Sequence, residues 1–240
     1  MIHVSELPLP LRGNMPTSSK ITCQKCEKVF SAEEFANLSN PQRADYKFCK
    51  ACLRVKLVEL RRNALEVLYG GPKIHKLTFD AFKSLPGKEK GLAVAREYSG
   101  ENLFFWGPCG TGKSHLAAAI MNEWVKNCPV SKIRYETPAT LNRRMRMLDP
   151  DEEQARLDDY INASLVVFDE VGFSQDTDFS KRIFYEILDG RDRREKRGMI
   201  ITSNLFIDDL AHLYKDDRIS SRIAGSFRVI QVTGEDMRGK

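Results

Sequence analysis

The sequence lacks any apolar run of about 18 residues, the length that a membrane-spanning helix requires. It also lacks the start of a secretory signal, because Met1 to Leu11 contain Glu6 and two prolines instead of a basic start and an apolar stretch. Internal repeats and low-complexity tracts are missing too. These absences argue against a membrane protein, a secreted protein and a repeat architecture, and we expect a cytoplasmic protein without membrane contact.

A large excess of one charge is absent as well, since the net charge of the 240 residues is only +5. Residues 1–76 contain 13 Lys and Arg against 7 Asp and Glu, whereas residues 77–240 contain 25 against 26. The basic front segment is compatible with a contact to nucleic acid or to an acidic protein. Charge of this size is also common on a merely solvated face.

Length and turn residues predict two units, because domains typically contain roughly 100–150 residues. Residues 1–20 contain Pro, Gly and Ser without periodicity, which indicates a flexible lead-in. Residues 21–70 contain two cysteine pairs, followed by leucines spaced for an amphipathic linker helix. Gly70-Gly71-Pro72 would end that helix, and residues 76–240 form the second unit.

The second unit alternates short apolar strands with longer helical patterns, which is typical of an α/β fold with a parallel sheet. The predicted strands are Asn102–Trp106, Ile133–Glu136, Leu165–Asp169, Met199–Ser203 and Arg228–Val232. The predicted helices include Lys113–Asn127, Ala139–Leu148 and Lys181–Lys196.

The most specific motif, G-x-x-x-x-G-K-[ST], lies between a predicted strand and a predicted helix. Its residues are Gly107, Pro108, Cys109, Gly110, Thr111, Gly112, Lys113 and Ser114. Glycines let backbone N–H groups face a phosphate, and the N-terminus of the following helix adds the positive end of its dipole. We predict that Lys113 reaches the β- and γ-phosphates of ATP and that the Ser114 hydroxyl ligates Mg²⁺.

Two acids and an amide follow the next apolar strands. Leu165–Phe168 is followed by Asp169 and Glu170, and Met199–Ser203 by Asn204. We predict that Asp169 holds Mg²⁺, directly or through water, and that Glu170 polarises the attacking water. Asn204 either orients that water or is an ordinary turn former.

Two groups of arginines are spaced for a helix. Arg218 and Arg222 are four residues apart and share a face, which is either solvated or directed into the ATP site of a neighbouring subunit. Arg143, Arg144 and Arg146 lie in a predicted helix and are candidates for contacts to single-stranded DNA.

From Leu77 onward these motifs resemble, in type and order, those of AAA+ ATPases of the DnaC, DnaI and IstB kind. The resemblance rests on Leu77–Phe82, the P-loop continuing through His115 to Ile120, Asp169–Gly172, Ile201–Leu205 and Arg218–Ile223. It implies an AAA+ core without a C-terminal helical lid and adds His115 to the nucleotide-binding residues. It also implies that Lys113 and Ser114 belong to Walker A, Asp169 and Glu170 to Walker B, that Asn204 is sensor 1 and that Arg222 is the arginine finger.

The front unit contains Cys23-x-x-Cys26 and Cys49-x-x-Cys52, the pairing of a structural four-cysteine zinc site. A disulfide pair is the alternative, which a reducing cytoplasm disfavours. Because four cysteines fill a tetrahedral shell, the Zn²⁺ in this zinc-ribbon-like module is expected to be structural. Aromatic and basic residues between the pairs suit either a miniature core or single-stranded nucleic acid.

The resemblance implies an ATP-dependent helper of DNA transactions, most simply a helicase loader that binds ATP, single-stranded DNA and a replicative helicase. DnaI-type loaders resemble this layout, so we expect the zinc module to contact the helicase and Arg222 to mediate self-assembly. The alternative is an IstB-like transposition helper that binds duplex DNA through its zinc module. A defence or signalling ATPase is a third reading, and the residues separate the first two poorly.

Overall fold

The computed structural model describes residues 20–31, 49–69, 74–172, 178–193 and 198–236. The chain divides into two compact units, Met1–Asn63 and Ala64–Lys240, and the division falls inside helix α1 (Lys50–Tyr69). The expected lead-in and the Gly70-Gly71-Pro72 boundary lie outside the described residues. Among the described helices, none is long and apolar enough to cross a membrane.

The front unit contains a short hairpin and the first part of the expected linker helix. Strands β1 (Lys20–Thr22) and β2 (Val29–Ser31) pair antiparallel, with Lys20 opposite Ser31. The first cysteine pair lies between these strands. Cys49 comes directly before α1, and Cys52 lies in its first turn.

The second unit is built on a five-stranded parallel sheet of order β4-β5-β6-β3-β7. The strands are β3 (Leu103–Trp106), β4 (Ile133–Glu136), β5 (Leu165–Val171), β6 (Gly198–Ser203) and β7 (Arg228–Gln231). All five predicted strands are confirmed, and β5 continues two residues beyond Asp169. The α/β prediction is therefore confirmed, because every neighbouring pair in this sheet is parallel.

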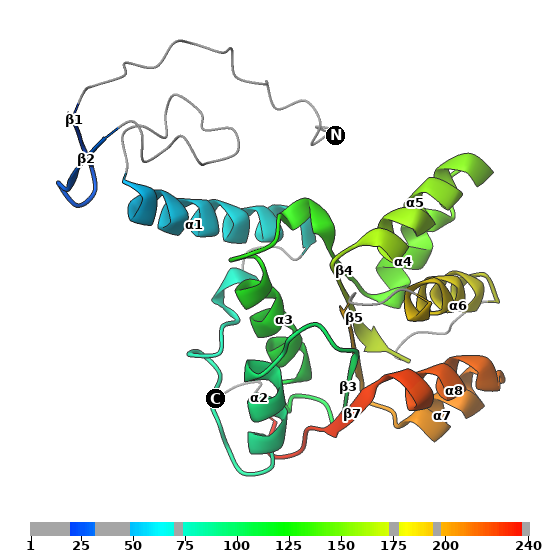
Figure 1. Cartoon of the computed structure of the whole chain (residues 1–240). Helices are drawn as coiled ribbons and strands as arrows, with labels where there is room; N and C mark the ends of the chain where they lie inside the picture. The colour runs from blue at the N-terminus through cyan, green and yellow to red at the C-terminus, as the bar shows by residue number, and fades with distance from the viewer. Residues whose placement is uncertain (1–19, 32–48, 70–73, 173–177, 194–197, 237–240) are drawn as a thin grey trace. The chain divides into compact units, whose positions relative to one another are not determined.

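Side chains alternate between two helical layers, as the period of a strand requires. Phe105, Val167 and Ile200 pack into one core, together with apolar residues of α3 (Lys113–Trp124). Phe104 and Phe168 pack into the other core. Figure 1 shows α2 (Glu89–Arg96) and α3 on the first side of the sheet and the later helices on the second. Those later helices are α4 (Pro138–Met145), α5 (Pro150–Asn162), α6 (Asp178–Asp192), α7 (Ile207–Tyr214) and α8 (Asp217–Ser226).

The observed helices differ from the predicted ones in their ends and in their number. Helix α3 ends at Trp124, three residues before the predicted Asn127, as the chain approaches Pro129, which disfavours helical geometry in the preceding residue. Helix α5 was not predicted, although Asp149 and Glu152 form a reciprocal capping box at its start. Short 3₁₀ turns at Ile74–Lys76 and Val130–Lys132 complete the unit.

Candidate functional site

The loop between β3 and α3 adopts a conformation that only glycine tolerates at three positions. Gly107, Gly110 and Gly112 have φ values of 142°, 72° and 100°. A Cβ on Gly107 would lie 2.1 Å from the Val232 carbonyl oxygen, and one on Gly112 would lie 2.7 Å from the Phe82 ring. The backbone is therefore tightly enclosed, and α3 begins directly after Gly112 with its N-terminus at the loop.

Lys113 is buried at the base of this loop. Its Nζ donates hydrogen bonds to the carbonyl oxygens of Gly107 and Pro108, each 2.7 Å away. Thr111, also buried, donates its hydroxyl to the Pro108 oxygen at 2.9 Å. These bonds hold the ammonium group beside the backbone of the loop while Pro108 and Cys109 remain exposed.

Asp169 is the centre of a hydroxyl network that joins four elements. Its Oδ1 accepts hydrogen bonds from Ser114 Oγ at 2.8 Å and from Thr202 Oγ1 at 2.5 Å. Its Oδ2 accepts one from Tyr135 Oη at 2.5 Å. The carboxylate is buried, and it brings together α3, β4, β5 and β6.

Glu170 interrupts the regular strand geometry. It has φ = 60°, an uncommon value for a residue other than glycine, and the register between β5 and β6 shifts between Phe168 and Val171. Its backbone N–H donates to Thr202 Oγ1 at 3.0 Å, so Thr202 connects both acids. Within the described residues its carboxylate accepts no hydrogen bond, and the residue is exposed. Backbone strain of this kind clusters at functional sites.

A cavity of about 380 Å³ opens between these groups. It is lined by Leu77, Gly110, Gly112, Lys113, Ser114, His115, Glu170, Thr202, Ser203 and Asn204. Gly110, Gly112, Lys113 and Ser114 of the predicted P-loop therefore meet Glu170 and Asn204 at the carboxyl ends of parallel strands, where α/β sheets bind their ligands. The other predicted residues of this site do not line the cavity: Gly107, Pro108, Cys109, Thr111 and Asp169. A larger cavity of about 560 Å³ lies near Trp124, at the other end of α3.

His115 has a structural contact in addition to its place on the cavity wall. Its Nε2 donates to the Thr78 carbonyl oxygen at 2.8 Å, and its ring packs edge-on against Phe82. Burial lowers the pKa of His115, although the bond to Thr78 opposes this shift. These contacts of the neutral His115 ring hold the segment that contains Thr78 and Phe82 against the start of α3.

The groups around the cavity fit a phosphorylated nucleotide and Mg²⁺. A glycine-rich loop that excludes Cβ atoms, a helix N-terminus and a buried ammonium group are the usual cradle of phosphates. The Ser114 hydroxyl and the Asp169 carboxylate are oxygen ligands of the type that Mg²⁺ prefers.

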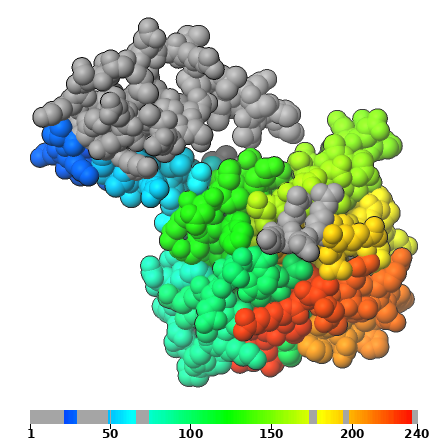
Figure 2. Space-filling view, viewed as in Figure 1, coloured from blue at the N-terminus to red at the C-terminus, as the bar shows by residue number. Residues whose placement is uncertain are grey.

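Arg222 and Arg218 do not line this cavity. Both guanidinium groups lie over the ring of Tyr185, at 5.6 and 4.9 Å from its centroid. Arg222 forms ion pairs with Asp189 and Asp192 of α6, the latter at 2.9 Å, and Arg218 pairs with Asp216. Figure 2 shows the surface of α8 (orange to red) next to that of α6 (yellow).

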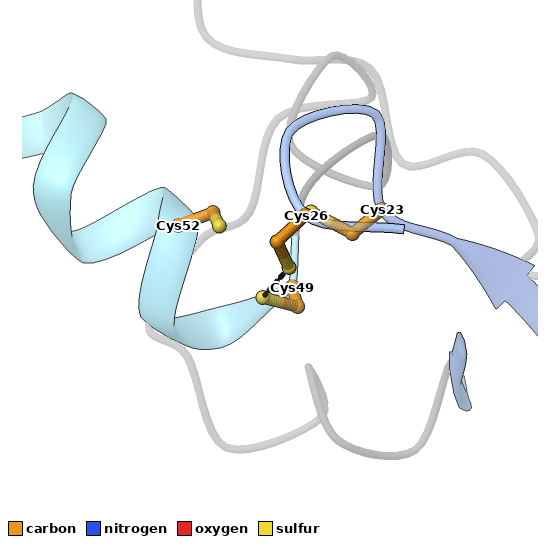
Figure 3. A group of neighbouring side chains, drawn as sticks. All are labelled: Cys23, Cys26, Cys49 and Cys52. Carbon is orange, nitrogen blue, oxygen red and sulfur yellow. Dashed lines mark hydrogen bonds between the residues drawn. The ribbon is translucent and has the colours of Figure 1, made fainter. Parts of the chain in front are cut away.

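The four cysteines of the front unit form a compact group. Their sulfur atoms all lie within 4.8 Å of one another, and the side chains converge from the hairpin turn and from the start of α1 (Figure 3). The sulfurs of Cys26 and Cys49 are 3.6 Å apart, and all four residues are free cysteines. Tetrahedral Zn–S bonds of 2.3 Å would place sulfurs about 3.8 Å apart. The group therefore fits one Zn²⁺ and contains no disulfide.

The thiols compete for protons in the absence of metal. Burial opposes ionisation of Cys23, but backbone N–H groups of Cys49, Lys25 and Cys26 bring its pKa to about 6. Hydrogen bonding to Cys26 and burial raise the pKa of Cys52 to about 12. Because a thiolate is the form that binds metal, Zn²⁺ would displace the protons that these sulfurs share.

Tyr135 and Thr202 were not among the predicted site residues. Each lies near the carboxyl end of a strand next to β5, on the same face as Asp169. The alternation of side chains along a strand indicates the face of the sheet on which each residue lies. The strand order that makes them neighbours of Asp169 is not visible in the sequence.

Comparison with known proteins finds relatives among helicase loaders and among ATP-binding proteins of insertion sequences. The chain is 33% identical to the replicative helicase loader DnaC of Escherichia coli (strain K12) over 129 residues, which are 50% of this chain and 52% of that protein. It is 26% identical to the insertion sequence IS232 putative ATP-binding protein of Bacillus thuringiensis subsp. berliner over 144 residues, 58% of this chain and 56% of that protein. The chain spans between about a third and just over half of the length of the curated relatives it matches first.

The crystal structure of DnaI superimposes with a TM-score of 0.59 at 24% identity, covering 74% of this chain and all of that chain, which supports the AAA+ fold. A sequence profile described as "IstB-like ATP binding protein" matches residues 90–240, which include every residue of the cavity except Leu77. The chain therefore belongs to the family of IstB-like ATP binding proteins.

Proposed function

We propose that this protein is an ATPase that assists DNA replication by loading a replicative helicase. The observation that carries the ATPase assignment is that Lys113, Ser114 and Glu170 line one cavity, with the Asp169 carboxylate bonded directly to Ser114 behind it. In this proposal the loop N–H groups and Lys113 bind the phosphates of ATP, and Ser114 with Asp169 holds Mg²⁺. Bound Mg²⁺ would neutralise charge on the β- and γ-phosphates.

The two acids divide the work of hydrolysis. Asp169 is buried and accepts three hydrogen bonds, so it is fixed in place and is poorly suited to accept a proton from water. Glu170 is exposed at the cavity, and its carboxylate accepts no bond within the described residues. Glu170 therefore acts as the base that polarises water, and Asn204, which lies on the same wall, orients that water.

Charge that develops on the γ-phosphoryl group needs a further cation, and Arg222 of a neighbouring subunit supplies it in this proposal. Arg222 lies on α8 and does not line the cavity of its own chain, so any action on ATP would be in trans. Arg218, whose side chain is 69% exposed, ranks second.

Helicase loading is preferred because the DnaC relative has the higher identity, 33% against 26% for the insertion-sequence protein. The four-cysteine group of the front unit would hold structural Zn²⁺ and present the surface that contacts the helicase. The second candidate, an IstB-like transposition helper that binds duplex DNA, is favoured by the family profile and by the IS232 relative.

The predicted contact to single-stranded DNA rests on Arg143 and Arg144 of α4 and on Arg146, which follows directly after α4 because the helix ends at Met145, three residues before the predicted Leu148. Arg144 pairs with the buried Glu136, and Arg146 lies over the ring of Phe179 at 5.6 Å. Arg143 is exposed and is the residue of the three with no such contact within the described residues. We therefore place the DNA contact at Arg143 first. Arg143→Ala should weaken single-strand binding and reduce its salt dependence, and an unchanged salt slope would remove α4 from the binding surface.

The deciding experiment tests the purified protein against the partner of each candidate function, a replicative helicase and a transposase. With ATP present, it should co-elute with the replicative helicase encoded in the same genome and increase helicase loading on single-stranded DNA. Lys113→Ala is the matched control. It retains the front unit, but it should lose the part of helicase loading that depends on ATP. Co-elution with a transposase instead, and an ATPase stimulated only by duplex DNA, would replace the proposal with the transposition helper.

A further inference from the structure

Tyr135 was not predicted as a site residue, but its phenol forms a hydrogen bond with the predicted magnesium ligand Asp169. Tyr135 lies on β4 opposite Val167, two residues before Asp169, and the alternation of side chains brings both to the α3 side of the sheet. Its Oη donates to Oδ2 of Asp169 at 2.5 Å. The hydroxyl can only donate here, because a carboxylate oxygen is an acceptor.

Three hydroxyl groups donate to the carboxylate of Asp169, two of them to Oδ1 and one to Oδ2. Ser114 and Thr202 both bind Oδ1, whereas among the described residues Tyr135 is the donor to Oδ2. Ser114 follows Lys113 in the P-loop and is expected to move when it ligates a metal. Tyr135 and Thr202 belong to the sheet, so they hold the carboxylate in a fixed orientation whether or not nucleotide is bound.

Tyr135 packs against the apolar core on the α3 side of the sheet, which fixes its ring beside Asp169. A hydroxyl donor that comes from a strand of the sheet is the arrangement that orients metal ligands from outside the coordination shell.

We propose that Tyr135 is a positioning residue for the Mg²⁺ of bound ATP, and that it acts by holding Oδ2 of Asp169 so that Oδ1 faces Ser114. The inference rests on the proposed ATP site. With Oδ2 taken by the phenol and Oδ1 shared, Asp169 serves Mg²⁺ through water or through Ser114, which suits an ion that keeps several of its waters.

The test removes only the hydroxyl. In Tyr135→Phe, the Mg²⁺ concentration that half-saturates binding of a fluorescent ATP analogue should rise about 10-fold, the usual effect of losing such a partner of a metal ligand. Affinity for the analogue in EDTA should match the parent protein, whereas the thermal midpoint of unfolding should fall modestly because the buried Oδ2 loses its donor. Thr202→Val, which removes a donor to Oδ1, should shift the Mg²⁺ dependence in the same direction.

Tyr98→Phe is the matched control. Tyr98 packs against Trp124 near the far end of α3, and its buried hydroxyl has no hydrogen-bond partner in the part of the chain that the structure describes, so its loss should leave Mg²⁺ dependence unchanged. An unshifted Mg²⁺ dependence in Tyr135→Phe overturns the inference, as does an equal loss of affinity with and without Mg²⁺. A parent protein that binds no nucleotide would instead refute the proposed function.

Discussion

At the scale of single residues, Arg222 is held by its own chain. It pairs with Asp189 and Asp192, and its side chain is 28% exposed. A guanidinium that acts on the ATP of a neighbour must leave or share these two carboxylates. The pairs with Asp189 and Asp192 therefore compete with any action of Arg222 in trans.

Arg222→Ala should bind ATP normally and lower turnover by about 10³–10⁵-fold, the range measured for arginine fingers. Mixing it with Lys113→Ala should restore some phosphate release, because an intact P-loop then faces an intact Arg222. Arg193→Ala is the control, since Arg193 pairs with the same Asp189 and is largely exposed. Mixtures that co-assemble but stay inactive would rule out Arg222 in trans and favour Arg218.

The residues that could be predicted are those whose neighbours in sequence create their chemistry. Lys113 and Ser114 lie within a contiguous motif, and Asp169 and Glu170 end an apolar strand. The residues that could not be predicted depend on the strand order β4-β5-β6, which places Tyr135 and Thr202 beside Asp169. Such pairings are non-local, and no local pattern encodes them.

At the scale of elements, strands were easier to predict than helices. A buried parallel strand is a short apolar run between polar residues, and the five runs were distinct. Helices α2, α5 and α7 were not among the named helices: α2 and α7 have only eight residues each, and the apolar stripe of α5 is sparse. Helix α5 buries only Leu157 and Tyr160 among its 13 residues. Its capping box at Asp149 and Glu152 was the available signal.

The hairpin turn supplies two of the four cysteines, and Cys49 before α1 and Cys52 in its first turn supply the others, so the metal should hold these elements together. Purified without chelator, the protein should contain about one zinc ion per chain. Cys49→Ser should lose the zinc and unfold the front unit, while nucleotide binding by the second unit persists. Cys128→Ser, which changes a cysteine outside the group, should retain the zinc. Absence of zinc, or loss of nucleotide binding in Cys49→Ser, would contradict the separation into two units.

At the scale of the whole molecule, the family profile and the cavity coincide in the second unit. The profile matches residues 90–240, and Leu77 is the single cavity residue that precedes it. The four-cysteine group lies entirely in the first unit. The residues that line the cavity therefore belong, with the exception of Leu77, to the part of the chain that the family profile matches.

The most direct test of the account measures ATP binding and phosphate release in the same samples of the parent, Lys113→Ala and Glu170→Gln proteins. Lys113→Ala should lose most ATP affinity, because it removes the buried ammonium group of the loop. Glu170→Gln should bind ATP like the parent and release phosphate at least about 100-fold more slowly, the minimum expected for loss of a general base. Hydrolysis by Glu170→Gln at the parent rate, or undiminished binding by Lys113→Ala, would contradict the account.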